Sequence, residues 1–327
     1  PNNYIPPQDP APPRTPREKF AANITAIRTL KSIEKRMADG GPHANGEEQE
    51  ILAQYSGWGG LSDAFEPNKD SWHSEYTELK SLLTEEEYAA ARSSTLTAFY
   101  TPPAVIDAMY TALRKMGVGA GTILEPSMGV GAFFGQSHSY LYEPTTRLFG
   151  VELDSLTGRI ARQLYQKANI QITGFEKADL PDSFFDVVIG NVPFGDYSVV
   201  DPQYNRLHFK IHDYFFAKSI DKLRTGGIIA FITTSGTLDK KSEEVRKYIN
   251  ARCDFIGAVR LPDSTFKSAG TKAMADIIFL QKRDRILEQD ASWLHTTQTE
   301  DGLALNSYFA EHPEMVCGTL KTVSGPY

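Results

Sequence analysis

Two patterns of hydrophobic and polar positions divide the chain near residue 97. Between residues 17 and 95, apolar side chains recur at helical spacing, as Phe20, Ile24 and Ile27 do, which predicts amphipathic helices. Beyond residue 97, short apolar runs alternate with helical segments. Strands joined by helices in this way form a mostly parallel, doubly wound α/β sheet, so we expect that fold class with an N-terminal helical region.

Seven apolar runs have the length and composition of strands. In chain order they are "TILEP", "RLFGVELD", "IQITGFEKADL", "FFDVVIGN", "TGGIIAFITTSG", "FIGAVRL" and "MADIIFLQKR". The last two runs leave no room for a crossover helix, so we expect that pair to be antiparallel. Pro102 and Pro103 stand where a helix tolerates proline at its start. Thr84 and Glu87 form a capping box that begins an earlier helix.

The same patterns predict four segments along the chain. Residues 1–16 are rich in proline and predict an extended linker or arm. Residues 17–95 form a helical accessory region, and residues 96–284 form the α/β domain. Residues 285–327 lose the alternation and are expected to be an appendage or the root of a further domain. Because the chain begins with proline instead of methionine, we expect it to be a piece of a longer protein.

Composition narrows the class of protein. Hydrophobic residues make up 41% and aromatic residues 11% of the 327 residues, which is enough to bury a core. Cys253 and Cys317 lie far apart and fit a reducing cytoplasm, and no apolar run is long enough to span a membrane. The net charge of −7 is not typical of a nucleic-acid binder. Two cationic stretches, 206–224 and 240–252, are interpreted as solvated helix faces.

Ligand-type residues stand where the predicted strands end. Glu125 and Pro126 close the first strand, and Gly129 and Gly131 lie in the turn that follows. In a doubly wound sheet, ligands bind at the carboxyl ends of the strands, and glycine lets a ligand approach the backbone closely. The turn has no third glycine and no Gly-Lys-Ser/Thr ending, which argues against a pyrophosphate or triphosphate cradle.

Acidic residues follow at the next two strand ends. Glu152 lies about 20 residues past the glycines, the offset at which a carboxylate takes both ribose hydroxyls of a nucleoside. In "ADL", which is expected to end the third strand, Asp179 is suited to accept a hydrogen bond from an exocyclic amino group, and Leu180 follows it. Each carboxylate alone is most simply a solvated strand end. Together with the glycine turn they predict a nucleoside site.

The fourth strand ends in "NVPF", residues 191–194. Asn191 presents an amide, Pro193 fixes the backbone of Val192 in an extended conformation, and Phe194 offers an aromatic face. This combination suits a flat ligand that carries an amino group.

These motifs resemble those of the S-adenosylmethionine-dependent N6-adenine DNA methyltransferases whose cofactor motifs precede the catalytic one. The resemblance covers residues 99–283 and implies a Rossmann-like methyltransferase sheet. It implies that "FYTPP", with Phe99, Tyr100, Thr101 and Pro102, contacts the methionine end of the cofactor. Glu125 is implied near its ammonium group, Glu152 at the ribose and Asp179 at the adenine. "YSGWGGL" further resembles the methylase portion of long methylase–helicase fusion proteins of mobile elements, which implies DNA and helicase-like domains as partners.

The resemblance also gives "NVPF" a catalytic role. An aromatic amine is a poor nucleophile because its lone pair is delocalised into the ring. The Asn191 side-chain oxygen and the Val192 carbonyl oxygen are implied to accept hydrogen bonds from the two amine hydrogens and so to free that lone pair. Phe194 is implied to stack on the adenine, which a duplex must first rotate out of its base stack. The family usually has proline where this chain has Val192.

Other interpretations stay open at this point. The substrate is alternatively a base in RNA or a glutamine side chain in a protein, or the chain is a DNA-binding or assembly module that keeps the fold without catalysis. His208, His212 and Asp213 are interpreted as helix packing and not as metal ligands. Phe266 or Lys267 is placed near the target base by the resemblance. The sequence does not predict the recognised DNA sequence, the oligomeric state or the effect of Val192 on activity.

Overall fold

The computed structural model describes residues 1–9, 11–95, 100–269 and 274–318. Its contacts form two compact units that interleave along the chain. Unit 1 comprises residues 1–120, 127–178 and 266–271, and unit 2 comprises residues 121–126, 179–265 and 272–327. No helix among the described residues is long and apolar enough to cross a membrane.

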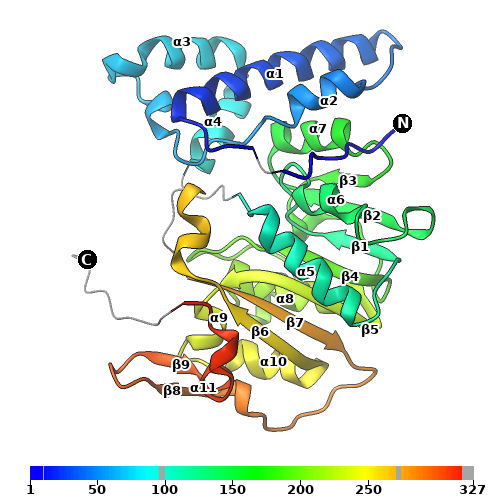
Figure 1. Ribbon diagram of the computed structural model, residues 1–327, viewed down its shortest axis with the longest axis vertical. Coiled ribbons are helices and arrows are strands. Elements are labelled where there is room, and N and C mark those ends of the chain that lie inside the picture. The colour runs from blue at the N-terminus through cyan, green and yellow to red at the C-terminus, as the bar shows by residue number, and fades with distance from the viewer. Residues whose placement is uncertain (10, 96–99, 270–273, 319–327) are drawn as a thin grey trace. The chain divides into compact units, whose positions relative to one another are not determined.

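The first part of unit 1 is helical, as the spacing of apolar residues predicts. Its helices are α1 (Pro16–Ala38), α2 (Gly46–Leu52), α3 (His73–Leu82) and α4 (Glu85–Ser94), drawn from blue to cyan in Figure 1. The Thr84 side chain accepts a hydrogen bond from the Glu87 N–H, and the Glu87 side chain accepts one from the Thr84 N–H, so the predicted capping box is confirmed. An aromatic cluster that includes Phe20, Trp58 and Trp72 fills the core of this region.

Unit 1 also holds α5 (Pro103–Lys115), α6 (Ala132–Ser137), β2 (Arg147–Glu152), α7 (Ser155–Leu164) and β3 (Asn169–Ile172). β2 and β3 pair in parallel, with Glu152 opposite Ile172. The N-terminal segment is extended and lies against the end of α7. Its Tyr4 N–H donates to the Leu164 carbonyl oxygen at 2.7 Å, and Asn3 forms a bridge with Tyr165.

Unit 2 holds β1 (Thr122–Glu125), β4 (Phe185–Asn191), α8 (Ile211–Lys222), β5 (Leu223–Thr234), α9 (Gly236–Asp239), α10 (Glu244–Arg252), β6 (Cys253–Arg260) and β7 (Ala275–Lys282). β4 pairs in parallel with both β1 and β5. β7 is antiparallel to β5 and to β6, so the predicted antiparallel pair is confirmed.

The seven strands form one sheet in the order β3-β2-β1-β4-β5-β7-β6. The expected mostly parallel, doubly wound α/β fold is therefore confirmed. One boundary was wrong: β3 ends at Ile172, and Asp179 follows seven residues later, beyond a short 3-10 turn at Phe175–Lys177. Phe175 and Leu180 are both buried although neither lies in a strand. Apolar residues therefore continue past the end of β3, which made the predicted strand too long.

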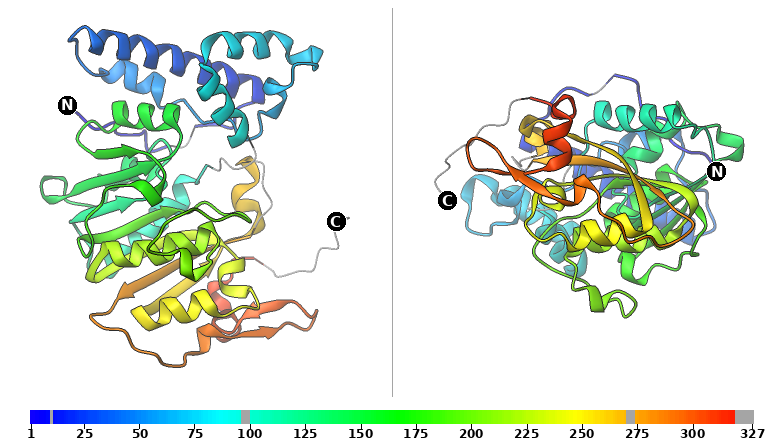
Figure 2. Two further views of the ribbon diagram at one scale, coloured as in Figure 1. Left: turned by 180° about the vertical axis from the view of Figure 1, so that it is seen from behind. Right: turned by 90° about the horizontal axis from the view of Figure 1, so that it is seen from below.

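The segment after β7 folds against unit 2. It contains β8 (Thr296–Gln298), β9 (Ala304–Asn306) and α11 (Ser307–Glu311), which pack together in orange and red in Figure 2. The Asn306 N–H donates to the Asp239 carboxylate at 2.8 Å.

Arg260, at the end of β6, is the charged centre of this part of the core. Its side chain is 2% exposed and makes two hydrogen bonds to Asp276, at 2.8 and 2.9 Å. It also pairs with Asp239 at 2.7 Å and lies over the ring of Phe309, 4.5 Å from the centroid. One guanidinium thus joins β6, β7, α9 and α11.

Replacing this arginine is expected to destabilise the fold strongly. Arg260→Ala leaves two carboxylates without their cation, so the free energy of unfolding in urea should fall by about 3–5 kcal/mol. The control is Lys167→Ala, which breaks an exposed ion pair with Glu143 (3.1 Å) and should cost less than about 1 kcal/mol. Equal losses in the two variants would contradict this role of Arg260.

Candidate functional site

The Glu152 carboxylate is held by two backbone N–H groups at the end of β2. Gly129 donates to one oxygen at 2.9 Å, and Asp154 donates to the other at 2.7 Å. The glycine turn and the acidic strand end, predicted from their offset in the sequence, are therefore in direct contact. These two hydrogen bonds give the carboxylate a fixed orientation.

The two glycines of the turn have different structural roles. Both have positive φ, +58° at Gly129 and +93° at Gly131. A Cβ added at Gly131 would lie 2.4 Å from the ring of Tyr165, so this glycine is required by packing at the start of α6. A Cβ added at Gly129 would meet nothing within 4 Å. The open space beside the Glu152 carboxylate therefore lies at Gly129.

Burial raises the pKa of Glu152 to about 7. The negative charge of Asp154 acts in the same direction, while the N–H groups of Asp154, Gly129 and Leu153 act against it. The carboxylate thus changes its ionisation near neutral pH.

Sequence analysis missed Leu153, the residue after Glu152. Its side chain is 75% exposed, which is unusual for a leucine beside a buried strand. An exposed apolar side chain next to a fixed carboxylate suits a ligand with a flat apolar part beside hydroxyl groups. The sequence "VELD" drew attention only to its acidic residue, and local sequence does not show the exposure of the leucine.

Residues 100–102 lead into α5 within the same unit. Thr101 is buried and Tyr100 is 53% exposed, while Pro102 stands at the N-cap of the helix. Burial raises the pKa of the Tyr100 hydroxyl, and the charge of Arg14 opposes this rise. Phe99, the remaining predicted residue of this motif, lies outside the described residues.

In unit 2, β1 and β4 bring together Glu125, Pro126 and the residue before Asn191. Glu125 is 2% exposed at the end of β1. A Cβ added at Gly190 would lie 3.4 Å from Cγ of Glu125 and 4.0 Å from Cδ of Pro126. Because β1 and β4 are parallel, the ends that carry Glu125 and Asn191 lie at the same edge of the sheet. The sequence predicted this juxtaposition.

The β4–β5 ladder continues one residue beyond Asn191. Asn191 pairs with Ile232, and the Val192 N–H donates to the Ile232 carbonyl oxygen at 3.0 Å. The Val192 side chain is 1% exposed. A proline at this position has no N–H and would lose this hydrogen bond.

The segment after Val192 leaves the sheet as a long loop. Pro193 and Phe194 are partly buried at its start. Farther along, the Asp201 carboxylate anchors the loop to α8, since it accepts hydrogen bonds from the Tyr214 hydroxyl at 2.6 Å and from Lys218 Nζ at 2.9 Å.

Asp179 and Leu180 lie in the segment before β4. Asp179 is exposed and Leu180 is buried, with its carbonyl oxygen bound by Lys222 Nζ at 2.9 Å. Asp179 therefore presents its carboxylate at the surface of unit 2, from a loop and not from a strand.

Most of the cations in the two basic stretches have an acidic partner. The ion pairs are Lys210–Asp196, Lys218–Asp201, Lys222–Asp182, Arg224–Asp186, Lys240–Asp213 and Lys247–Glu243. Arg246 is fully buried and donates to main-chain carbonyl groups. These stretches consequently give no concentrated positive patch.

The histidine and aspartate residues near the start of α8 do not form a metal site, and Phe266 does not lie at the surface. Asp213 forms an ion pair with Lys240, and burial lowers the pKa of His212. In the described part of the chain, no three His, Cys, Asp or Glu side chains are grouped as metal ligands. Phe266 is buried, and the side chain of Lys267 lies outside what the structure describes.

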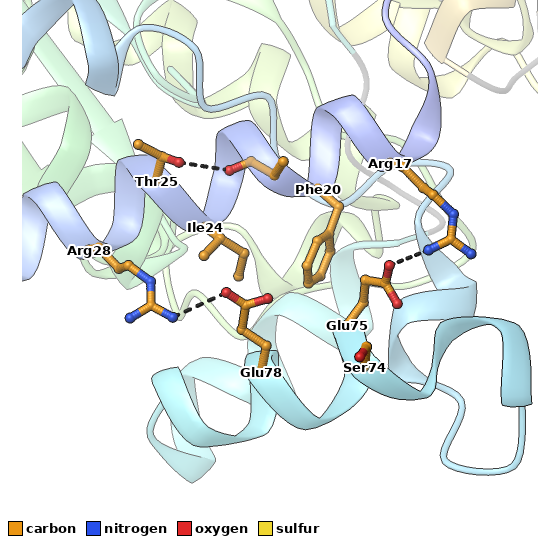
Figure 3. A pocket seen from close by; sticks show the side chains of 9 residues that line it. Arg17, Phe20, Ile24, Thr25, Arg28, Ser74, Glu75 and Glu78 are labelled. Carbon is orange, nitrogen blue, oxygen red and sulfur yellow. Dashed lines mark hydrogen bonds and ion pairs between the residues drawn. The ribbon is translucent and has the colours of Figure 1, made fainter.

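A separate hollow lies between α1 and α3 (Figure 3). Phe20 and Ile24 line it, and two ion pairs cross it. They join Arg17 to Glu75 and Arg28 to Glu78, the latter at 3.1 Å. Because these charges neutralise one another, the hollow offers no charged group for chemistry.

Comparison with known proteins adds a family match. The model of the N-6 DNA methylase family matches residues 82–305. Defense against restriction protein B of Escherichia phage P1 is 26% identical over 295 residues, which are 88% of this chain and 11% of that protein. The chain thus spans about a tenth of the length of this relative.

Two solved structures have a similar fold. One is a putative class I S-adenosylmethionine-dependent methyltransferase from Listeria monocytogenes, with 18% identity, 81% of this chain and 88% of that chain covered, and a TM-score of 0.48. The other is a modification subunit of a putative type I restriction enzyme from Vibrio vulnificus, with 18% identity, coverage of 74% and 57%, and a TM-score of 0.49.

The raised pKa of Glu152 predicts a pH dependence of stability. A glutamate with a folded pKa of about 7, against its ordinary value of 4.5, favours folding fully below pH 4.5 and loses this contribution as the pH rises through 7. Relative to Glu152→Gln, which does not titrate, the wild type should lose on the order of 2–3 kcal/mol of unfolding free energy between pH 4.5 and 7.5. Urea unfolding at several pH values measures this difference. Parallel curves for the two proteins would refute the assignment.

Proposed function

The chain belongs to the N-6 DNA methylase family, and from this premise we propose that it transfers a methyl group from S-adenosylmethionine to the N6 amino group of adenine in DNA. S-adenosylmethionine is the methyl donor of this family. The observation that carries the proposal is the end of β4, where Asn191 stands at the same sheet edge as Glu125 and the Val192 main chain is hydrogen-bonded to β5.

The residues around Glu152 fit the nucleoside part of S-adenosylmethionine. The carboxylate has a fixed orientation and faces the open space at Gly129, so its oxygens are suited to accept hydrogen bonds from both ribose hydroxyls. Leu153 offers an exposed apolar surface for the adenine ring. Gly131 shapes the start of α6 behind the cofactor.

Further roles follow from the family pattern, residue by residue. Asp179 accepts a hydrogen bond from the adenine amino group of the cofactor, with Leu180 beside it. Glu125 and Pro126 lie near the cofactor ammonium group. The segment Phe99–Pro102, with Tyr100 and Thr101, contacts the methionine end. Bound S-adenosylmethionine supplies a methyl group activated by its sulfonium.

The chain's own contribution to methyl transfer is to prepare the amine. The Asn191 side-chain oxygen and the Val192 carbonyl oxygen accept hydrogen bonds from the two N6 hydrogens, and the nitrogen lone pair is thereby released from the ring. The nitrogen forms its bond to the methyl carbon as the sulfur–carbon bond breaks, and one proton then leaves to solvent. Catalysis rests on position and preorganised dipoles, so a strong base is not required.

Pro193 and Phe194 hold the target base. Pro193 keeps the preceding carbonyl in an extended segment, and Phe194 stacks on the adenine after it has rotated out of the duplex. The paired cations of residues 206–252 leave little positive surface for the DNA backbone. We therefore expect the DNA backbone to be bound by residues outside these two stretches.

We assign the segments accordingly. Residues 96–284 form the catalytic domain, residues 17–95 form an accessory region, residues 1–16 form an arm, and residues 285–327 lead toward further domains. The sequence pattern favours a helicase domain in the same protein as the partner. It also favours a protein that is encoded by a mobile element and acts in the cytoplasm.

The proposal is tested by incubating the protein with DNA, RNA and a protein fraction and with S-adenosylmethionine labelled on its methyl group. Label on N6 of adenine in DNA is expected. Cofactor binding with label only on RNA bases or on glutamine would show that adenine in DNA is not the substrate. A protein that does not bind the cofactor at all would contradict the proposed enzymatic activity.

Asn191→Ala should remove most of the transfer. The loss of one preorganised acceptor is expected to lower the rate at saturating cofactor by about 100- to 1,000-fold, with the cofactor dissociation constant kept within about twofold. Asn169→Ala, at the exposed start of β3, is the matched control and should keep the wild-type rate. Undiminished transfer by the Asn191 variant would contradict the proposed role.

Val192→Pro restores the residue usual in the family, yet it should slow the reaction here. The variant loses the N–H that binds the Ile232 carbonyl oxygen, so the catalytic carbonyl is less firmly placed and transfer should fall at least about tenfold. Val192→Ala keeps the N–H and should retain most of the rate. A proline variant as fast as the wild type would show that the hydrogen bond does not matter.

A further inference from the structure

The "YSGWGG" turn buries two polar atoms whose presence packing alone does not explain. Tyr55 is 2% exposed and Trp58 is 1% exposed, and their rings meet edge to face with centroids 6.2 Å apart. Among the described residues, neither the Tyr55 hydroxyl nor the Trp58 indole N–H makes a hydrogen bond of normal geometry. An unsatisfied buried polar group destabilises the fold, so phenylalanine would pack at position 55 at lower cost.

The position of this turn is fixed from α1. Asn23, which is fully buried on α1, donates through its amide to the Gly57 carbonyl oxygen at 2.6 Å. Its side-chain oxygen accepts a hydrogen bond from the Ser56 N–H at 2.9 Å. The turn therefore moves with the helical region and holds Tyr55 in a defined place.

Tyr55 packs in the same buried cluster as Leu156 and Ile160, which lie in the first half of α7. There the Asp154 carboxylate caps the helix, accepting hydrogen bonds from the Thr157 N–H at 3.0 Å and from the Thr157 hydroxyl at 2.7 Å. Burial, and after it the charge of Asp154, raise the pKa of Tyr55, while Thr157 and Trp58 approach its hydroxyl closely enough to act in the opposite direction. Tyr55 thus adjoins the helix cap from the side of the accessory region.

The same cap holds the Glu152 carboxylate. Asp154 donates its backbone N–H to Glu152 at 2.7 Å and uses its side chain to cap α7. A shift of Asp154 therefore moves one of the two hydrogen bonds that orient Glu152. A chain of contacts joins Tyr55, Thr157, Asp154 and Glu152.

Residues of the accessory region also form hydrogen bonds with α7 farther along the helix. Arg159 makes two hydrogen bonds to Glu34, at 2.6 and 2.8 Å, and a third to Glu87 at 2.7 Å. One turn later, the Gln163 side chain accepts a hydrogen bond from the Ala44 N–H at 3.0 Å. The helix that follows Glu152 is thus fixed at three successive points by residues that precede residue 95.

We propose that the N-terminal helical region positions the cofactor ribose site, and that the Tyr55 hydroxyl does so by supporting the Asp154–Thr157 cap behind Glu152. Tyr55 is a positioning residue, since it acts on the ligand only through Glu152. The inference rests on the proposed function in one respect, namely that the ligand of Glu152 is the ribose of S-adenosylmethionine.

Tyr55→Phe separates this role from a structural one. It removes a buried hydroxyl that has no normal hydrogen bond, so the melting temperature should stay the same or rise. Affinity for S-adenosylhomocysteine, measured by titration calorimetry, should nevertheless fall at least about fivefold. Transfer at saturating cofactor should keep the wild-type rate, so that the cofactor KM changes and kcat does not.

Tyr88→Phe is the matched control from the same aromatic cluster. The Tyr88 hydroxyl donates to the Phe65 carbonyl oxygen at 3.3 Å, within the helical region. Its loss should lower the melting temperature slightly and leave the cofactor affinity unchanged. The two variants therefore have opposite expected patterns of stability and affinity.

A second measurement does not depend on the cofactor. Carboxyl NMR of the ligand-free protein follows the titration of Glu152, whose charged and titratable neighbours are Asp154 and Tyr55 itself. In Tyr55→Phe the midpoint should move from about 7 toward the ordinary glutamate value of 4.5, because a loosened cap admits water, whereas Tyr88→Phe should leave it in place.

The outcomes distinguish the two proposals. If the wild type does not bind S-adenosylhomocysteine, the proposed function fails, and the NMR titration still decides the role of Tyr55. If Tyr55→Phe leaves both the affinity and the Glu152 midpoint at wild-type values, the positioning role is overturned.

Discussion

The proposed catalytic segment depends on one main-chain hydrogen bond, from the Val192 N–H to the Ile232 carbonyl oxygen at 3.0 Å. It extends the β4–β5 ladder past Asn191 and thereby fixes the backbone at the point where the chain leaves the sheet. A proline at this position fixes its own φ angle but has no N–H with which to extend the ladder. Valine therefore replaces one kind of constraint with another, and the departure from the family pattern does not by itself imply an inactive site.

A second constraint acts on the cofactor side. Glu152 is oriented by the backbone N–H groups of Gly129 and Asp154. Its position thus depends on how well the glycine turn and the start of α7 are held. The helical region holds α7 through Glu34, Ala44 and Glu87, so it contributes to the position of Glu152.

The sequence predicted all seven strands, the antiparallel end of the sheet, and the meeting of Gly129 with Glu152 and of Glu125 with the end of β4. These follow from local periodicity and from the rule that parallel strands share an edge. It misplaced Asp179 because Phe175 and Leu180 continue an apolar pattern outside any strand. It could not predict the exposure of Leu153 or the contacts of Tyr55 and Tyr4 with α7, which depend on packing between distant parts of the chain.

The central proposal is that Glu152 binds the cofactor ribose and that Asn191 binds the amine to be methylated, and a crystal structure with bound S-adenosylhomocysteine tests it most directly. The account predicts both ribose hydroxyls within about 2.6–3.2 Å of the Glu152 carboxylate oxygens, and the Asn191 side-chain oxygen facing the cofactor sulfur. A nucleoside bound elsewhere, or an Asn191 amide turned away from the sulfur, would contradict it.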